Sequence, residues 1–157
     1  MLTFRGLDLQ SGAYRFDLVR GYFEPPDVRG EDDVIPGRPG RDAMTREADV
    51  LRPRIEGSII GEGATRAERQ ASWHDATVAL MAVLDMTLAS GALVVGPEPP
   101  PWAPDDIVYL GMAGEATLQA RCTGMVSELP NGTMTEQRWS IDLEAVDGAF
   151  WSAEESS

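Results

Sequence analysis

The chain alternates between segments with a two-residue hydrophobic period and one long segment with a helical period. Residues 14–20 place three large apolar side chains on one side and polar side chains on the other, which is typical of a half-buried strand. The same alternation recurs over residues 116–129 and 133–146, and Pro-Asn-Gly lies between them. Because Asn-Gly favours a tight hairpin turn, these two segments are predicted to form a long antiparallel hairpin.

The helical period covers residues 64–89. Thr65 and Glu68 have the spacing of a capping box at its start. At 1.5 Å per residue the helix would be about 35 Å long, enough to cover a whole sheet face. Its apolar stripe consists of residues three or four apart, namely Trp73, Thr77, Leu80 and Leu84. Three further residues widen this stripe: Ala76, Met81 and Val83.

Shorter strands are expected over residues 2–9, 48–60, 92–95 and 107–110. From about residue 27 to residue 47 the chain is polar and rich in Gly and Pro, and this loop is longer than a simple connection needs. It is either disordered or reaches a partner.

Together these elements predict an α+β fold, with antiparallel strands, one long packed α-helix and a long β-hairpin or loop. At 157 residues the length predicts one domain over residues 1–151, followed by a flexible tail over 152–157.

Composition changes this picture in one respect. The formal net charge is −13, and all 13 basic residues are arginine. A surplus of acid argues against gripping a nucleic-acid backbone, although a conduit that passes DNA without binding it would benefit from repulsion. The absence of lysine fits arginine pairing at subunit interfaces, but a GC-rich genome explains it more simply. No apolar run is long enough for a membrane span, and no signal peptide is visible.

Candidate chemistry is sparse. Cys122 and His74 are each the only residue of their type, which leaves no internal disulfide and no ordinary zinc site. Cys122 is interpreted as a small buried side chain and His74 as a surface residue. Several carboxylate pairs occur, and a hydrolase based on Asp142 and Glu144 stays open as a hypothesis, but solvated surface acids are the simpler interpretation. Without lysine there is no Walker-type phosphate loop. The sequence predicts no enzyme, no cofactor and no metal.

Several of these pieces, in this order, resemble the distal tail proteins and tail-tube-like ring proteins of long-tailed, siphovirus-type bacteriophages. They are the strand at 14–20, the loop Asp-Asp-Val-Ile-Pro-Gly at 32–37, the strand around 54–57, the helix, and Ser-Ile-Asp-Leu-Glu-Ala at 140–145. The resemblance implies that the α+β fold is an antiparallel β-sandwich with one long packed α-helix and a long β-hairpin or loop. It also implies a structural virion protein whose copies close into a ring, expected to be a hexamer, at the distal end of a phage tail.

The resemblance also implies partners and a location. The ring would link the tail-tube protein to the tail-tip hub protein of the baseplate and leave a channel for DNA, with no membrane contact. Such a protein is assembled in the host bacterial cytoplasm and resides in the virion. The contacts between subunits would come from ionic and apolar residues of the long loop: Arg29, Asp32, Asp33, Val34, Ile35, Arg38 and Arg41.

Two questions stay open at this point. Many relatives carry a second, carbohydrate-binding-like C-terminal domain that this sequence does not reach, which puts receptor binding in doubt. The position in the tail (distal ring, tube or terminator) is also undecided. The competing class is a small carbohydrate-binding β-sandwich without catalysis, whose stacking surfaces would be the aromatic residues Tyr22, Phe23, Trp102 and Trp151.

Overall fold

The computed structural model describes residues 1–21, 28–29, 47–48, 51–103, 114–146 and 151–152. The strand expected at 107–110, most of the loop at 27–47 and nearly all of the tail at 152–157 therefore lie outside the described residues. In chain order the elements are β1 (Leu2–Phe4), β2 (Leu7–Asp8), β3 (Tyr14–Arg20), β4 (Val28–Arg29), β5 (Glu47–Ala48), β6 (Arg54–Ile60), α1 (Arg66–Val83), β7 (Gly91–Val95), β8 (Ala116–Ser127), β9 (Glu136–Ala145) and β10 (Trp151–Ser152).

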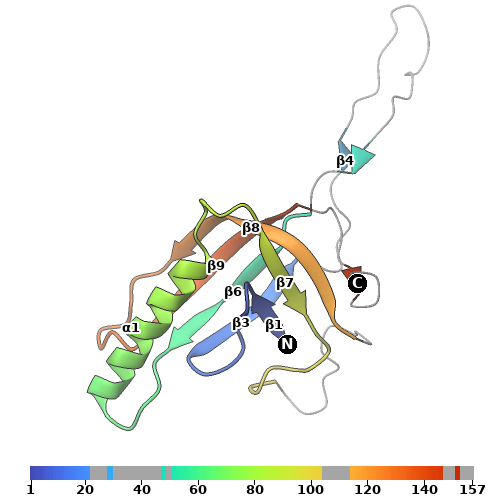
Figure 1. Cartoon of the computed structure of the whole chain (residues 1–157). Coiled ribbons are helices and arrows are strands. Elements are labelled where there is room, and N and C mark those ends of the chain that lie inside the picture. The colour runs from blue at the N-terminus through green and yellow to red at the C-terminus, as the bar shows by residue number, and fades with distance from the viewer. Residues whose placement is uncertain (22–27, 30–46, 49–50, 104–113, 147–150, 153–157) are drawn as a thin grey trace, which may run out of the picture.

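One continuous antiparallel sheet dominates the molecule (Figure 1). Its strand order is β2-β1-β7-β8-β9-β6-β3, with β10 paired to β8, while β4 and β5 form a separate two-stranded sheet. With the single helix of the described residues, this arrangement confirms the α+β class and the antiparallel sheet. The predicted hairpin is also confirmed, because β8 pairs with β9.

The sheet bends at β8, and this bend encloses the core. Residues 116–120 of β8 pair with β7, whereas residues 120–127 pair with β9, with a shift of register between Cys122 and Gly124. A bulge of this kind lets one strand serve two parts of a folded sheet. At the far end of the sheet the Phe16 N–H of β3 donates to the Leu9 carbonyl, 3.0 Å away, just after β2. The predicted sandwich is thus one bent sheet whose two ends meet.

The core contains the apolar side chains that the two-residue period placed on the inner side. Burial of each large aliphatic or aromatic side chain contributes about 1.5–3 kcal/mol, and β1, β3, β6, β7 and β9 each contribute two or more. The largest fully buried side chains are Phe4, Phe16, Leu2, Leu9, Ile55, Ile59, Leu80, Leu84, Leu93, Leu118, Ile141 and Leu143.

Three strand boundaries differ from those expected. The segment at 2–9 is split into β1 and β2 because Arg5 and Gly6 turn with φ of 49° and 81°. The segment at 48–60 forms its long strand only from Arg54, after Pro53, which has no N–H to donate to a ladder. The hairpin turn is broader than Asn-Gly alone, since the Asn131 side chain accepts hydrogen bonds from two residues of the returning chain, Thr135 N and Glu136 N.

The start of α1 is the one predicted. Thr65 Oγ1 accepts from the Glu68 N–H at 3.2 Å, and the Glu68 carboxylate accepts from the Thr65 N–H at 3.3 Å. Both halves of the capping box are therefore present. Gly61 allows the chain to pass under the helix, because a Cβ there would lie 1.9 Å from the Arg69 carbonyl oxygen.

The end of α1 corrects the prediction. The helix stops at Val83 with Leu84 as its C-cap, so its length is about 27 Å instead of about 35 Å. The Asp85 carboxylate accepts from the Thr87 N–H and hydroxyl at 2.9 and 2.7 Å, which closes a turn in place of further helix. Leu80 is the only buried residue of α1, so the helix covers less of the sheet than expected.

Three polar contacts hold α1 against the sheet. The Tyr14 hydroxyl of β3 donates to the Ala76 carbonyl at 2.7 Å, and Gln70 donates to the Thr133 carbonyl in the β8–β9 connection at 2.7 Å. At the other end, Arg5 donates to the Val83 carbonyl at 3.0 Å. The last turn of α1 contains no basic residue, and this arginine supplies the positive charge that a helix C-terminus favours.

Candidate assembly surfaces

The loop residues expected at subunit contacts lie almost entirely outside the described part of the chain. Of the seven, only the backbone of Arg29 is described: it belongs to β4 and pairs with Glu47 of β5. The other six, Asp32, Asp33, Val34, Ile35, Arg38 and Arg41, fall between these two strands. The described backbone therefore shows where this segment leaves and rejoins a two-stranded sheet, and it leaves the contact prediction untested.

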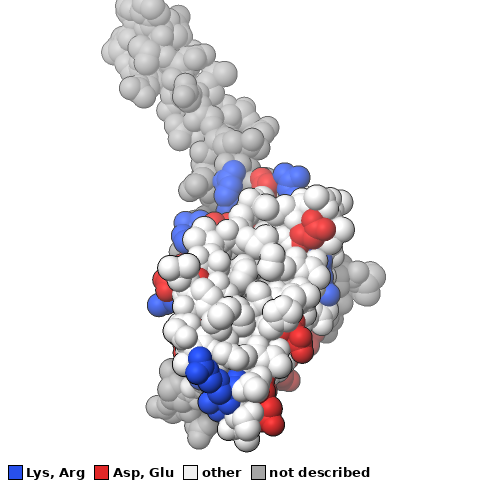
Figure 2. All heavy atoms as spheres, turned by 90° about the vertical axis from the view of Figure 1, so that its left-hand side faces the viewer, with Lys and Arg blue, Asp and Glu red and all other residues white. Residues whose placement is uncertain are grey.

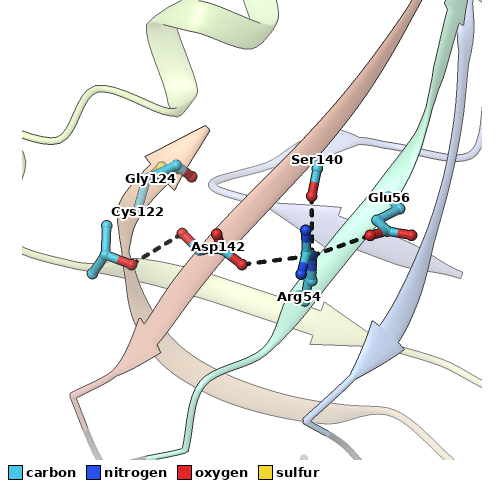
Figure 3. Close-up of polar contacts among 7 residues, drawn as sticks. Arg54, Glu56, Cys122, Gly124, Ser140 and Asp142 are labelled. Carbon is cyan, nitrogen blue, oxygen red and sulfur yellow. Dashed lines mark hydrogen bonds and ion pairs between the residues drawn. The ribbon is translucent and has the colours of Figure 1, made fainter. Parts of the chain in front are cut away.

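The outer face of β6 and β9 carries a cluster of charged side chains around Arg54 (Figure 3). Its Nε lies 3.1 Å from the Glu56 carboxylate and 3.8 Å from the Asp142 carboxylate, and it donates to the Ser140 hydroxyl at 3.0 Å. Glu56 lies two residues further along β6, on the same face as Arg54. The other two partners are placed by the antiparallel register of β6 against β9, in which Arg54 is opposite Asp142 and Glu56 is opposite Ser140.

A second ion pair crosses from β8 to β9. The Arg121 Nη2 lies 2.9 Å from the Glu144 carboxylate, and these two residues are opposite each other in the ladder. Exposed pairs of this kind contribute only about 0–1 kcal/mol each. The two acids of the hydrolase hypothesis, Asp142 and Glu144, thus each lie beside an arginine on the exposed face of the sheet.

The side of the molecule that carries α1 is different in character. Figure 2 shows this side: charged side chains lie around its margin, and a broad uncharged area occupies the middle. Val78 and Met81 of α1 are 56% and 50% exposed, and Met86 and Leu88 in the turn that follows are 53% and 44% exposed. We call these four residues the α1 apolar face.

The α1 apolar face corrects part of the sequence prediction. Ala76 and Val83 pack against the core as expected, but Met81, assigned to the same stripe, points to solvent. The sequence feature that indicates an exposed apolar surface on α1 is the absence of any charged residue from 76 to 84. A helix segment that is apolar on all sides cannot turn every side toward one sheet.

The turn after α1 is well fixed. Hydrogen bonds from the Thr87 hydroxyl and backbone N–H hold the pKa of Asp85 below its usual value. The Arg5 side chain also binds this turn: its Nη1 lies 3.0 Å from the Val83 carbonyl oxygen and 3.5 Å from the Asp85 carbonyl oxygen. Arg5 carries no signal of this role in the sequence, because no local pattern connects residue 5 with residue 83.

The two solitary residues lie where the sequence indicated. Cys122 is 3% exposed, and burial raises the pKa of its thiol. The His74 side chain is 71% exposed on α1, next to Asp75. Among the described residues, no three His, Cys, Asp or Glu side chains gather as a metal site would require. No described helix is long and apolar enough to cross a bilayer.

A solvent-open hollow lies at one end of the bent sheet. It has a volume of about 360 Å³ and is lined by residues from three chain segments: Gln10, Ser11, Gly12, Tyr14, Arg15, Glu62, Pro101 and Trp102. Of the four aromatic residues that could support carbohydrate stacking, Trp102 is the one whose side chain is described, and it is 39% exposed.

No protein-family model matches the sequence, and no curated protein matches it. Among the solved structures with a similar fold is the crystal structure of SPP1 Dit (gp 19.1), described as a paradigm of the hub adsorption apparatus in phages that infect Gram-positive hosts. The two chains superpose with a TM-score of 0.60 at 12% sequence identity. The match covers 96% of this chain and 51% of the Dit chain, so this chain spans about half the length of that protein. At this identity the likeness shows the fold alone: the chain shares its fold with Dit, a distal tail hub protein of a phage, as the sequence resemblance implied.

Proposed function

We propose that this chain is a structural subunit of a phage tail, whose copies close into a ring at the distal end of the tail. The ring is expected to be a hexamer that joins the tail-tube protein to the tail-tip hub and leaves a channel for DNA. The observation that carries the proposal is the fold likeness to Dit over 96% of the chain. The net charge of −13 supports a channel that DNA crosses without binding.

The long loop is proposed to contribute to the contacts between subunits. Its sequence alternates arginine with acid around the apolar pair Val34 and Ile35, and its ends pair as β4 and β5 apart from the main sheet. Arginine and carboxylate residues form bidentate pairs across interfaces. The residues in question are those predicted from the sequence: Arg29, Asp32, Asp33, Val34, Ile35, Arg38 and Arg41. The assembled particle would be part of the virion, built in the bacterial cytoplasm.

The first test is the solution mass of the purified chain by light scattering at several concentrations, together with negative-stain images. The proposal expects a species of about six times the chain mass of 17.0 kDa with a central hole. A chain that stays monomeric at every concentration contradicts the ring.

The loop contribution has its own test. Replacing Arg38 and Arg41 together by Glu should weaken the ring, because each reversal turns an attraction into a repulsion. Arg66→Glu on α1 is the matched control for each single reversal, Arg38→Glu and Arg41→Glu: Arg66 is exposed and the charge change is the same. Loss of the ring in the control as well would indicate a general charge effect.

The hollow beside Trp102 favours one second candidate, saccharide binding. An exposed indole can stack on a sugar ring, and the exposed side chains of Arg15 and Glu62 in the same hollow can hydrogen-bond to its hydroxyls. A glycan screen tests this candidate: binding that is lost in Trp102→Ala would support it, and the absence of any binding by the wild-type chain would refute it.

A further inference from the structure

We propose that the α1 apolar face is a contact surface for a second copy of this chain within the ring. The inference rests on the proposed function and deepens it, because it assigns the contact to named, described residues outside the long loop. It starts from a mismatch between the composition of α1 and its burial.

Residues 76–83 of α1 carry no charged side chain on any side of the helix, and Thr77 is their one polar residue. Residues 76–83 read Ala-Thr-Val-Ala-Leu-Met-Ala-Val, and a helix that is apolar on all sides is normally buried. Here Leu80 is buried and Ala76 and Val83 pack against the core, whereas Val78 and Met81 are half exposed. The sheet thus covers one side of this segment and leaves an equally apolar side in contact with water.

The exposed side extends beyond the helix and is preorganised. Met86 and Leu88 continue it in a turn that is fixed by the hydrogen bonds to Asp85 and by the Arg5 contact. Between the larger side chains, Ala79 and Ala82 are also exposed, and small residues allow another backbone to approach closely. A rigid surface loses little conformational entropy when a partner covers it.

Charge indicates a second copy as the partner. Two chains that each carry a net charge of −13 repel each other across most of their surfaces. Residues 76–84 carry no charge, and the uncharged area in Figure 2 lies on this side of the molecule. Among residues 76–88 only Asp85 is charged, and its carboxylate accepts hydrogen bonds from Thr87. Like-charged copies therefore meet few opposing carboxylates there, and burying exposed apolar surface drives such an association.

The decisive experiment compares two substitutions of equal chemistry. Val78 and Val146 are 56% and 57% exposed, on α1 and just after β9 respectively. Val78→Asp should raise the concentration needed for self-assembly at least about tenfold, since a carboxylate would be buried in the contact. Val146→Asp should leave that concentration unchanged. Sedimentation velocity on the full chain measures both, and thermal melts establish that both variants are folded.

A second readout does not depend on weakening the contact. Cys122 is buried, so Met81→Cys provides the accessible thiol of the variant. A maleimide should label it quickly in the monomer and slowly in the assembled state. If Val78→Asp proves unfolded, this protection experiment decides the inference by itself.

The outcomes separate the inference from the proposed function. A wild-type ring that persists in Val78→Asp, with Met81→Cys still labelled quickly, overturns the α1 contact and leaves the ring intact. A wild-type chain without self-association overturns the ring and the α1 contact together. A ring lost in Val78→Asp but retained in Val146→Asp supports both.

Discussion

At the scale of single residues, the most consequential contact joins Arg5 to the end of α1. Its hydrogen bond to the Val83 carbonyl satisfies a group that the helix leaves without an intrahelical partner. The guanidinium also lies 5.1 Å from the centre of the Phe4 ring. None of this is visible in a local sequence pattern, because Arg5 and Val83 are far apart in the chain.

Gly91 makes room for this arginine, and that role can be tested. A Cβ at position 91 would lie 2.2 Å from Arg5 Cγ and 2.4 Å from Arg5 Nε. Gly91→Ala should therefore destabilise the fold by about 1–3 kcal/mol, as overpacking does. In an Arg5→Ala background the same substitution should cost much less. Urea denaturation of the wild type, the two single variants and the double variant gives the free energies of unfolding for a double-mutant cycle. If Gly91→Ala lowers the free energy of unfolding equally in both backgrounds, Arg5 is not what the methyl group displaces.

Cys122 gives a prediction about pH. Burial raises the pKa of its thiol above the usual value of about 9, so the folded state holds the proton more tightly than the unfolded chain does. The resulting stability is fully present below about pH 9 and is lost as the pH rises through the folded pKa. Chemical denaturation between about pH 8 and 10 should show a steeper loss of stability for the wild type than for Cys122→Ala. Parallel curves would contradict the assignment.

At the scale of elements, the sequence predicted most of what local patterns can determine. The alternation in β3 places Tyr14, Phe16 and Leu18 inside, and the capping box starts α1 where expected. The end of α1 was misjudged because helical periodicity continues past Leu84, whereas a local side-chain hydrogen bond from Thr87 to Asp85 stops the helix. Competition of this kind between side chain and backbone is weakly encoded in hydrophobic patterns.

The two sides of α1 should respond differently to truncation. Leu80 is fully buried, so Leu80→Ala should destabilise the monomer by about 2–5 kcal/mol through lost burial and a cavity. Val78 is half exposed, so Val78→Ala should change monomer stability by no more than about 0.5 kcal/mol. Both values come from denaturation at concentrations below assembly. A large cost for Val78→Ala under those conditions would mean that its side chain is already covered within the chain.

At the scale of the whole molecule, the strand order is what the sequence could not supply. β6 lies between β3 and β9, although α1, β7 and β8 separate β6 from β9 in the chain. Hydrophobic periods identify which residues face inward, but they do not determine which strands become neighbours. The elements predicted the α+β class, and the resemblance to ring proteins implied the sandwich. The exposed apolar surface of α1 became visible only with the tertiary structure.

The salt dependence of assembly should distinguish between the two proposed contacts. If the α1 apolar face, in which residues 76–84 carry no charge, contributes most, added salt mainly screens the repulsion between chains of net charge −13 and assembly strengthens. If arginine–carboxylate pairs of residues 29–41 contribute most, salt screens attraction and assembly weakens. The Debye length falls from about 10 Å at 0.1 M to about 3 Å at 1 M, so this range is sufficient.

We expect the association constant to rise at least about tenfold over that range, equivalent to about 1.4 kcal/mol. Sedimentation velocity at several NaCl concentrations measures it, with Val146→Asp as the folded control and Val78→Asp as the variant of the contact. A constant that falls with salt would assign the main contact to the loop. In that case the Arg38 and Arg41 reversal, and not Val78→Asp, should abolish the ring.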